Sequence, residues 1–150
     1  MRRRSALSGV LLAALAVTFA HPARGETART LYLLKCSGCH RADGQGAADA
    51  GVPRFPGFIA DLARDPGGRT YMLHVPGVAS SGLSDADLTG VLNYLLDRWS
   101  GAPAGNVKRF TPQEVATLRA VAVNDIVGYR RTLVARLRKS GATIAAYPWP

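Results

Sequence analysis

Apolar residues recur at helical intervals in the segment that follows Ser84. The recurring positions are Leu88, Val91, Leu92, Leu95 and Trp99. Intervals of three and four residues place these side chains on one face of a helix, and that face is expected to be buried. Ser84 is a preferred N-cap residue, and Asp85 and Asp87 interact favourably with the helix dipole in the first turn. The pattern predicts a helix that starts at Ser84 and packs along one face.

Other segments predict three more helices, a tight turn and an extended loop. Residues 27–35 are rich in leucine and form a short helix candidate. The Thr-Pro-Gln-Glu run at 111–114 is a capping box with proline at the first helical position, and a further helix is expected within 124–141. Glycines in 43–46 predict a tight turn whose backbone can pass close to a flat ligand. The prolines of 52–57 predict an extended loop.

The first 25 residues have the composition of a secretory signal peptide. Residues 2–4 are arginines, and an apolar run extends over 6–20. This run is shorter than the about 20 residues of a membrane-spanning helix, so we expect a cleaved signal rather than an anchor. Small residues at 18–20 and 23–25 offer two cleavage positions. The sequence predicts an exported chain, and the periplasm is the compartment if the export is bacterial.

Charge is distributed unevenly over the 150 residues, whose net charge is +9. Residues 26–100 carry seven basic and eight acidic side chains, whereas 101–150 carry eight basic and two acidic ones. A stretch rich in Gly, Ala and Pro at 100–105 has the composition of a linker. We therefore divide the chain into a signal peptide (1–25), a near-neutral domain (26–100) and a linker plus basic helical extension (101–150). Nucleic acid is not expected as a partner of an exported chain.

The most specific motif is the run Cys36-Ser37-Gly38-Cys39-His40. In an exported protein, C-x-x-C-H predicts a covalent attachment site for haem c. Two thiols three positions apart on a turn can reach the two vinyl groups of one porphyrin and form thioethers. His40 then lies under the ring and can give an imidazole nitrogen to the iron as the proximal ligand. The motif predicts one covalent haem c.

Three other interpretations of the cysteine pair are weaker. A closed zinc site needs four ligands, and beyond the motif only His74 is available, or His21 if the signal is cleaved early. A thioredoxin-type redox pair would follow a strand in a βαβ pattern, which the sequence lacks. A disulfide between Cys36 and Cys39 would close a loop too short to constrain the unfolded chain strongly.

Residues 27–99 resemble a class I c-type cytochrome domain. The resemblance rests on the entry helix with Tyr32, the CSGCH motif, the glycine turn, the proline loop and the final helix after Leu-Ser-Asp, and it covers about half of the chain. It implies an all-α fold, a small cytochrome c-like haem domain that here carries a helical C-terminal extension. It also implies that a carbonyl of the proline loop, that of Pro53 here, accepts the proximal imidazole N–H and makes His40 a more basic ligand.

The distal ligand departs from the family pattern. Family members commonly carry a methionine shortly before the final helix, but residues 75–82 contain no methionine, histidine or lysine. The nearest candidates are Met72 and His74, which would point to the same side in an extended chain and to different sides in a helix. Bound Met72 would give a high potential, bound His74 a lower one, and an open site would permit peroxide or gas chemistry. The sequence leaves these three possibilities open.

The resemblance implies an electron carrier rather than an enzyme. We expect single electrons to pass from a periplasmic dehydrogenase to a terminal oxidase or another carrier, with the haem as the redox group. Two alternatives remain at this stage. One is an open-site haem protein that binds peroxide or gases, and the other is a haem subunit of a larger dehydrogenase complex.

The basic extension allows three interpretations. Its apolar stripe can pack on the haem domain and leave its cations solvated. It can instead dock on an acidic redox partner, because complementary charge speeds encounter. Peripheral contact with anionic lipid is the third, and it is least favoured because Tyr129 is the only aromatic anchor on the stripe. The cations concerned are Arg130, Arg131, Arg136, Arg138 and Lys139.

Overall fold

The computed structural model describes residues 27–101 and 107–144. The predicted signal peptide, most of the predicted linker and residues 145–150 lie outside the described residues, so what the sequence predicts for them stays a prediction. Within the described part the chain is all-α, as the sequence predicts, and its one β feature is an isolated bridge between Ala47 and Val52. None of the helices in this part is long and apolar enough to cross a membrane.

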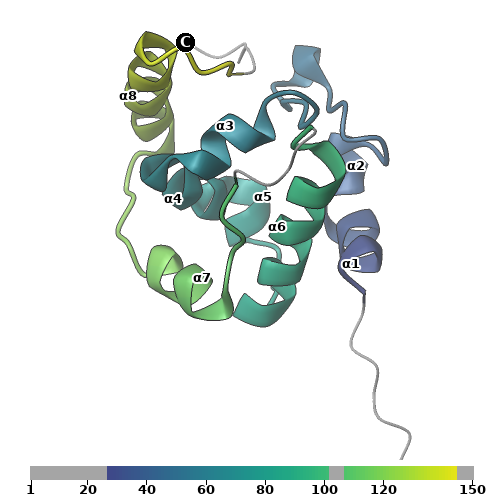
Figure 1. The fold of residues 1–150 in the computed structure, drawn as a ribbon. Helices are drawn as coiled ribbons and strands as arrows, with labels where there is room; N and C mark the ends of the chain where they lie inside the picture. The colour runs from purple at the N-terminus through teal and green to yellow at the C-terminus, as the bar shows by residue number, and fades with distance from the viewer. Residues whose placement is uncertain (1–26, 102–106, 145–150) are drawn as a thin grey trace, which may run out of the picture.

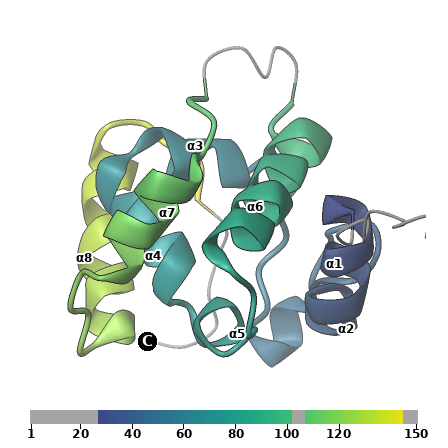
Figure 2. The same ribbon diagram turned by 90° about the horizontal axis from the view of Figure 1, so that it is seen from below.

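Eight α-helices and a short 3-10 helix, η1, make up the described ranges (Figure 1). In chain order they are α1 (Ala28–Lys35), α2 (Ser37–His40), η1 (Ala48–Ala50), α3 (Ile59–Arg64), α4 (Pro66–His74), α5 (Pro76–Ala79), α6 (Asp85–Trp99), α7 (Pro112–Arg119) and α8 (Ile126–Lys139). Helices α7 and α8 lie on one side of the molecule and α1 and α2 on the other, with α4 and α6 between them (Figures 1 and 2).

Four helices start where the sequence predicts. Thr27, Ser84, Thr111 and Asp125 are the N-caps of α1, α6, α7 and α8, and each side-chain oxygen accepts a backbone N–H from three residues further on. These bonds satisfy N–H groups that have no partner within the helix. The predicted starts of these four helices are confirmed. They could be predicted because a capping side chain acts within a single turn.

A helix that the sequence analysis did not predict separates Met72 from His74. Helix α4 starts after the N-cap Asp65, whose side chain accepts a hydrogen bond from Gly68 N at 2.9 Å, and Pro66 occupies its first position. Residues two apart on a helix point in directions about 200° apart. Of the two arrangements that the sequence left open, the structure therefore shows the helical one, in which the two side chains are separated.

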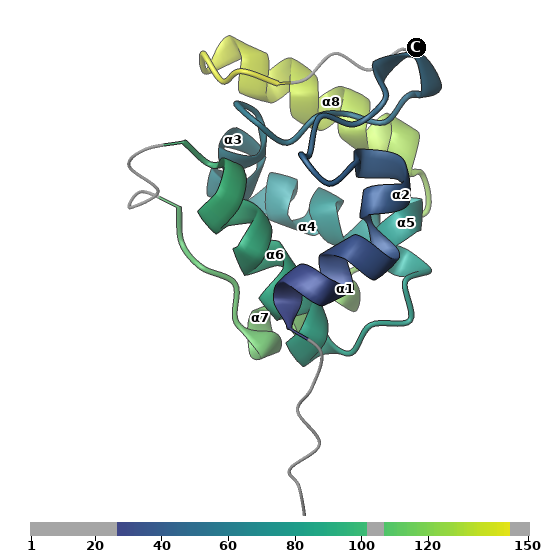
Figure 3. The same ribbon diagram turned by 90° about the vertical axis from the view of Figure 1, so that its right-hand side faces the viewer.

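The buried side chains form two clusters. The first joins α1, α3, α4 and α6, with α1 lying against α6 (Figure 3), and it also includes Val107, Phe110 and Val115. The second lies between α4 and α8 and contains Tyr71, Leu133, Val134, Leu137 and Ile144. We use "the extension" for residues 107–144. Because it contributes to both clusters, the extension packs onto the N-terminal helices, which is the first of its three interpretations.

The first interpretation also expected the cations of α8 to be solvated, and two arginines of this helix are instead paired or buried. Arg136 donates two hydrogen bonds to the Asp65 carboxylate, at 2.6 and 2.7 Å. Arg130 is buried, with its guanidinium 5.8 Å from the centre of the Tyr71 ring. Part of the positive charge of the extension therefore serves packing, and a partner has less of it to bind than the sequence count indicates.

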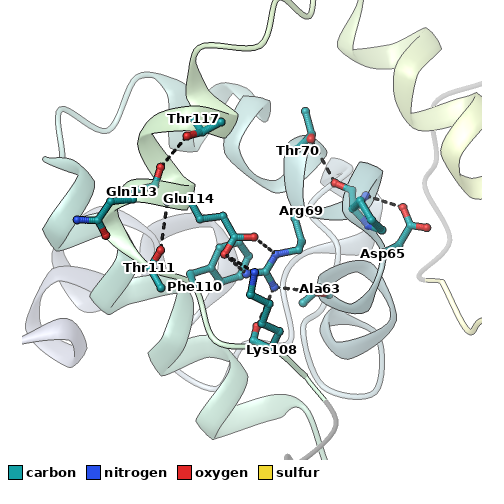
Figure 4. Close-up of polar contacts among 12 residues, drawn as sticks. Ala63, Asp65, Arg69, Thr70, Lys108, Phe110, Thr111, Gln113, Glu114 and Thr117 are labelled. Carbon is teal, nitrogen blue, oxygen red and sulfur yellow. Dashed lines mark hydrogen bonds and ion pairs between the residues drawn. The ribbon is translucent and has the colours of Figure 1, made fainter.

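Arg69 of α4, which is buried, forms an ion pair with Glu114 of α7, which is partly exposed (Figure 4). Arg69 Nε and Nη2 donate to the two carboxylate oxygens of Glu114 at 2.7 and 2.8 Å. Nη1 donates to the carbonyls of Ala63 and Lys108 at 2.9 and 2.8 Å. The guanidinium also lies 3.5 Å from the centre of the Phe110 ring. The buried charge is thus well satisfied, which is the condition under which such a pair stabilises a fold.

We expect this pair to make stability depend on pH in acid. The hydrogen bond from Arg69 lowers the pKa of the Glu114 carboxyl in the folded chain. A lowered carboxyl pKa contributes stability above its unfolded value of about 4.3, and the contribution is lost as the pH falls through the folded value. Glu114→Gln should therefore flatten the change in unfolding free energy between about pH 5 and pH 3. Urea unfolding at several pH values measures this dependence. If the slope of unfolding free energy against pH were the same in Glu114→Gln and the unmodified protein, the pair would not contribute to stability.

Candidate functional site

The C-x-x-C-H motif forms a single helical turn, α2, directly after α1. Ser37 Oγ donates to the Leu33 carbonyl at 2.7 Å and so ties α2 to α1. His40 N donates to the Cys36 carbonyl at 2.9 Å. Because residues three and four apart share a face of a helix, the turn places Cys36, Cys39 and His40 on one side. Both cysteines are free thiols, Cys36 half-buried and Cys39 exposed.

His40 is held by the proline loop. Its Nδ1 lies 3.1 Å from the Pro53 carbonyl oxygen, and since a carbonyl can only accept, Nδ1 is the nitrogen that donates. Nε2 then keeps a lone pair that can bind a metal. The ring stacks on Phe55 with 4.2 Å between centroids and planes 20° apart. Burial lowers the pKa of His40, which favours the neutral form that a metal needs.

Gly46 allows the proline loop to approach His40. Its N–H donates to the His40 carbonyl at 3.0 Å, and its φ of +66° lies in the region that favours glycine. A Cβ at this position would lie 2.5 Å from the Val52 oxygen and 2.6 Å from the Pro53 oxygen. The glycines of 43–46 predict a turn that makes room for a flat ligand. The close approach that the structure shows is to the loop that orients His40.

An aromatic cluster lies beside His40. Tyr32 is fully buried, with its ring centroid 5.2 Å from that of Trp99 and 6.4 Å from that of Phe55. Its hydroxyl donates to the Arg41 carbonyl at 2.5 Å, and burial raises the pKa of Tyr32 well above its usual range, so it stays a donor. Arg41 has a φ of +62°, which is strained for a residue with a side chain. Tyr32 thus secures the strained residue that follows the motif.

Met72 and His74 face different neighbours. Met72 is 6% exposed and belongs to the first cluster, against which Cys36 also packs. His74 lies with Nδ1 2.8 Å from the Thr70 carbonyl and Nε2 2.8 Å from the Val121 carbonyl of the extension. The structure therefore brings Met72 into the cluster beside the motif and directs His74 to the extension.

The described residues do not favour the zinc or dithiol interpretations. Across 27–101 and 107–144, no three His, Cys, Asp or Glu side chains are grouped so that they could hold a metal ion. Burial raises the pKa of the Cys36 thiol, whereas reactive dithiols depend on a lowered one. Two open cavities of about 480 Å³ each lie along α8, and neither is lined by a residue of the motif.

The donors at the motif fit a covalent haem c. The turn supplies two free thiols, and His40 supplies an imidazole whose Nδ1 is anchored and whose Nε2 is available. Thiols for thioether bonds and a neutral imidazole for the iron are the groups that this cofactor takes from a protein. The hydrogen bond from His40 to Pro53 also suits an iron ligand, because an anchored Nδ1–H fixes the tautomer and strengthens Nε2 as a ligand.

The comparisons with known proteins agree with this chemistry. A family model described as Cytochrome c matches residues 25–99, which is half of the chain. No curated protein and no solved structure matches it. The matched range contains the motif, the proline loop and α6, and it ends before the extension. The chain belongs to the cytochrome c family, which makes it an electron-transfer protein with covalently bound haem c and redox proteins as partners.

Proposed function

We propose that this chain is a monohaem electron carrier in which Cys36 and Cys39 form the thioethers and His40 Nε2 binds the iron. The observation that carries the proposal is the hydrogen bond from His40 Nδ1 to the Pro53 carbonyl. His40 lies on the same helical turn that presents both thiols. When bound, the haem supplies the redox-active iron. The chain attaches and orients it and lines it with apolar and aromatic side chains.

We infer that Met72, rather than His74, is the distal ligand. Both ring nitrogens of His74 lie at hydrogen-bond distance from backbone carbonyls, so binding the iron would break its contact with Val121. Met72 is instead buried in the first cluster, against which Cys36 packs. Because thioether ligation raises the potential of a haem iron, the carrier works at high potential.

Spectra of two variants test the ligand assignment. A thioether bound to ferric haem gives a weak charge-transfer band in the far red, so the unmodified ferric protein should show this band in a low-spin spectrum. Met72→Ala should abolish the band. His74→Ala should retain it, because the Arg69–Glu114 pair still holds α4 in place.

The opposite pattern would contradict the assignment. Loss of the low-spin spectrum only in His74→Ala would indicate two histidine ligands. A high-spin spectrum in the unmodified protein, with rapid binding of carbon monoxide to the reduced form, would exclude both residues as ligands and favour peroxide or gas chemistry.

The carrier works, on this proposal, in the periplasm, between a dehydrogenase as donor and a terminal oxidase or another carrier as acceptor. Its support is the signal-peptide pattern of residues 1–25 together with a motif for covalent haem attachment in an exported chain. Exposed cations on α8, Arg138 and Lys139 among them, favour a partner with an acidic surface.

A further inference from the structure

The extension holds α4 along its whole length. At the start of α4, Arg136 pairs with Asp65, the N-cap residue. In the middle, Glu114 pairs with Arg69, as Figure 4 shows. At the end, the Val121 carbonyl meets His74 Nε2. All three partners from the extension lie beyond residue 99, where the match to the cytochrome c family ends.

The middle contact has the most hydrogen bonds of the three. Arg69 is 5% exposed as a residue, and its guanidinium makes two bonds to Glu114 and two to backbone carbonyls. The planar guanidinium also lies over Phe110, so its plane is fixed as well as its position. In contrast, the Arg136 side chain is 57% exposed, and water screens its charge. The Arg69–Glu114 pair therefore fixes the position of α4 more firmly than the exposed Arg136–Asp65 pair does.

The position of Met72 depends on how α4 is turned. Met72 follows Arg69 by three residues, so the two side chains point within about 60° of each other on one face of the helix. With Arg69 anchored to α7, Met72 and Leu73 enter the first cluster, whereas Tyr71 enters the second. A rotation of α4 by about 100° that brought Met72 to the present direction of Tyr71 would move Met72 from the first cluster towards the second.

We propose that the extension positions the distal ligand, and that Arg69 and Glu114 are the positioning residues. This inference rests on the proposed function, specifically on Met72 as the ligand. The pair holds α4 in the rotation that keeps Met72 in the cluster beside the motif. The part of the chain outside the family domain thereby controls how easily the distal position opens to another ligand.

The test uses the full-length, haem-loaded protein and imidazole as an added ligand. Glu114→Gln removes the charge that fixes Arg69, and Asp97→Asn is the control, because Asp97 pairs with Arg109 and so joins the extension to α6 rather than α4. Imidazole can bind the ferric iron only after Met72 has left. We expect Glu114→Gln to bind imidazole about tenfold more tightly and to weaken the far-red band, and Asp97→Asn to stay within about twofold of the unmodified protein.

The outcomes separate this inference from the proposed function. If Glu114→Gln lowers the unfolding free energy but keeps the imidazole affinity and the band, the pair is only structural and the inference is overturned. An unmodified protein with covalent, reversibly reducible haem but no far-red band also overturns it and leaves the electron carrier standing. A protein without covalent haem overturns the proposed function itself. If Glu114→Gln does not fold, Glu114→Asp replaces it, since the shorter side chain keeps the charge and cannot form both bonds, and the same imidazole criterion applies.

Discussion

Changing Cys36 and Cys39 together to alanine is expected to give a chain that loses its haem in acid–acetone extraction and fails to fold stably. The thioethers are the covalent link, and without them only the iron ligands retain the cofactor. A domain of this size buries a small core, and a bound haem stabilises the folded state by an amount that grows with the logarithm of its affinity. Expression in a host with haem-attachment machinery, followed by extraction and circular dichroism, measures both losses.

A matched variant shows whether the loss is specific to the thiols. Ser37→Ala changes the same turn and removes the bond from Ser37 Oγ to Leu33, but it leaves both sulfurs in place. We expect it to retain covalent haem. A purified, unmodified protein that is colourless and binds zinc would contradict the assignment of the motif, and so would retention of covalent haem in the double variant.

The helices that frame the site were predictable because their signals are local. Ser84 caps α6 and Thr111 caps α7 through bonds to N–H groups three residues away. Such caps need no information from the rest of the chain. The haem-attachment motif was predictable for the same reason, because one helical turn holds both thiols and His40. Pro53 is different, since it lies 13 residues from His40 and was assigned through the family resemblance.

The start of helix α4 also has a local signal in the sequence. Asp65 followed by Pro66 is an N-cap before a proline at the first helical position. The two glycines that follow lower helix propensity and conceal the element. The structure explains one of them, because a Cβ at Gly68 would lie 2.1 Å from the Leu62 carbonyl oxygen at the end of α3.

The contacts of the extension were beyond sequence reasoning because they join distant positions. Arg69 and Glu114 are 45 residues apart, and Asp65 and Arg136 are 71 apart. A count of charges shows a basic extension beside a near-neutral domain, but it does not show which charges meet. Only the packing of α7 and α8 against α4 decides that Arg136 is paired and Arg130 is buried.

Gly46→Ala is expected to be among the most damaging single substitutions in the haem domain. The new Cβ would meet two carbonyl oxygens, at 2.5 and 2.6 Å, and the backbone would have to keep a φ of +66°. The unfavourable φ costs about 1–2 kcal/mol and the forced shift of packed atoms about 1–3 kcal/mol more. Because one of the two oxygens is that of Pro53, the shift also loosens the bond that orients His40.

The same substitution at Gly90 provides the control, since its expected effect has the opposite sign. Gly90 lies inside α6, and a Cβ there would meet only the Ala28 Cβ, at an ordinary contact distance of 3.5 Å. Alanine in a helix is favoured over glycine by up to about 1 kcal/mol, so Gly90→Ala should stabilise the protein. Urea unfolding of both ferric variants gives the two free energies, and redox titration follows the potential. A less basic His40 donates less electron density to ferric iron, so the potential of Gly46→Ala should rise while that of Gly90→Ala stays unchanged. Equal stability and equal potential in the two variants would show that the Gly46 turn does not hold the Pro53 carbonyl against His40.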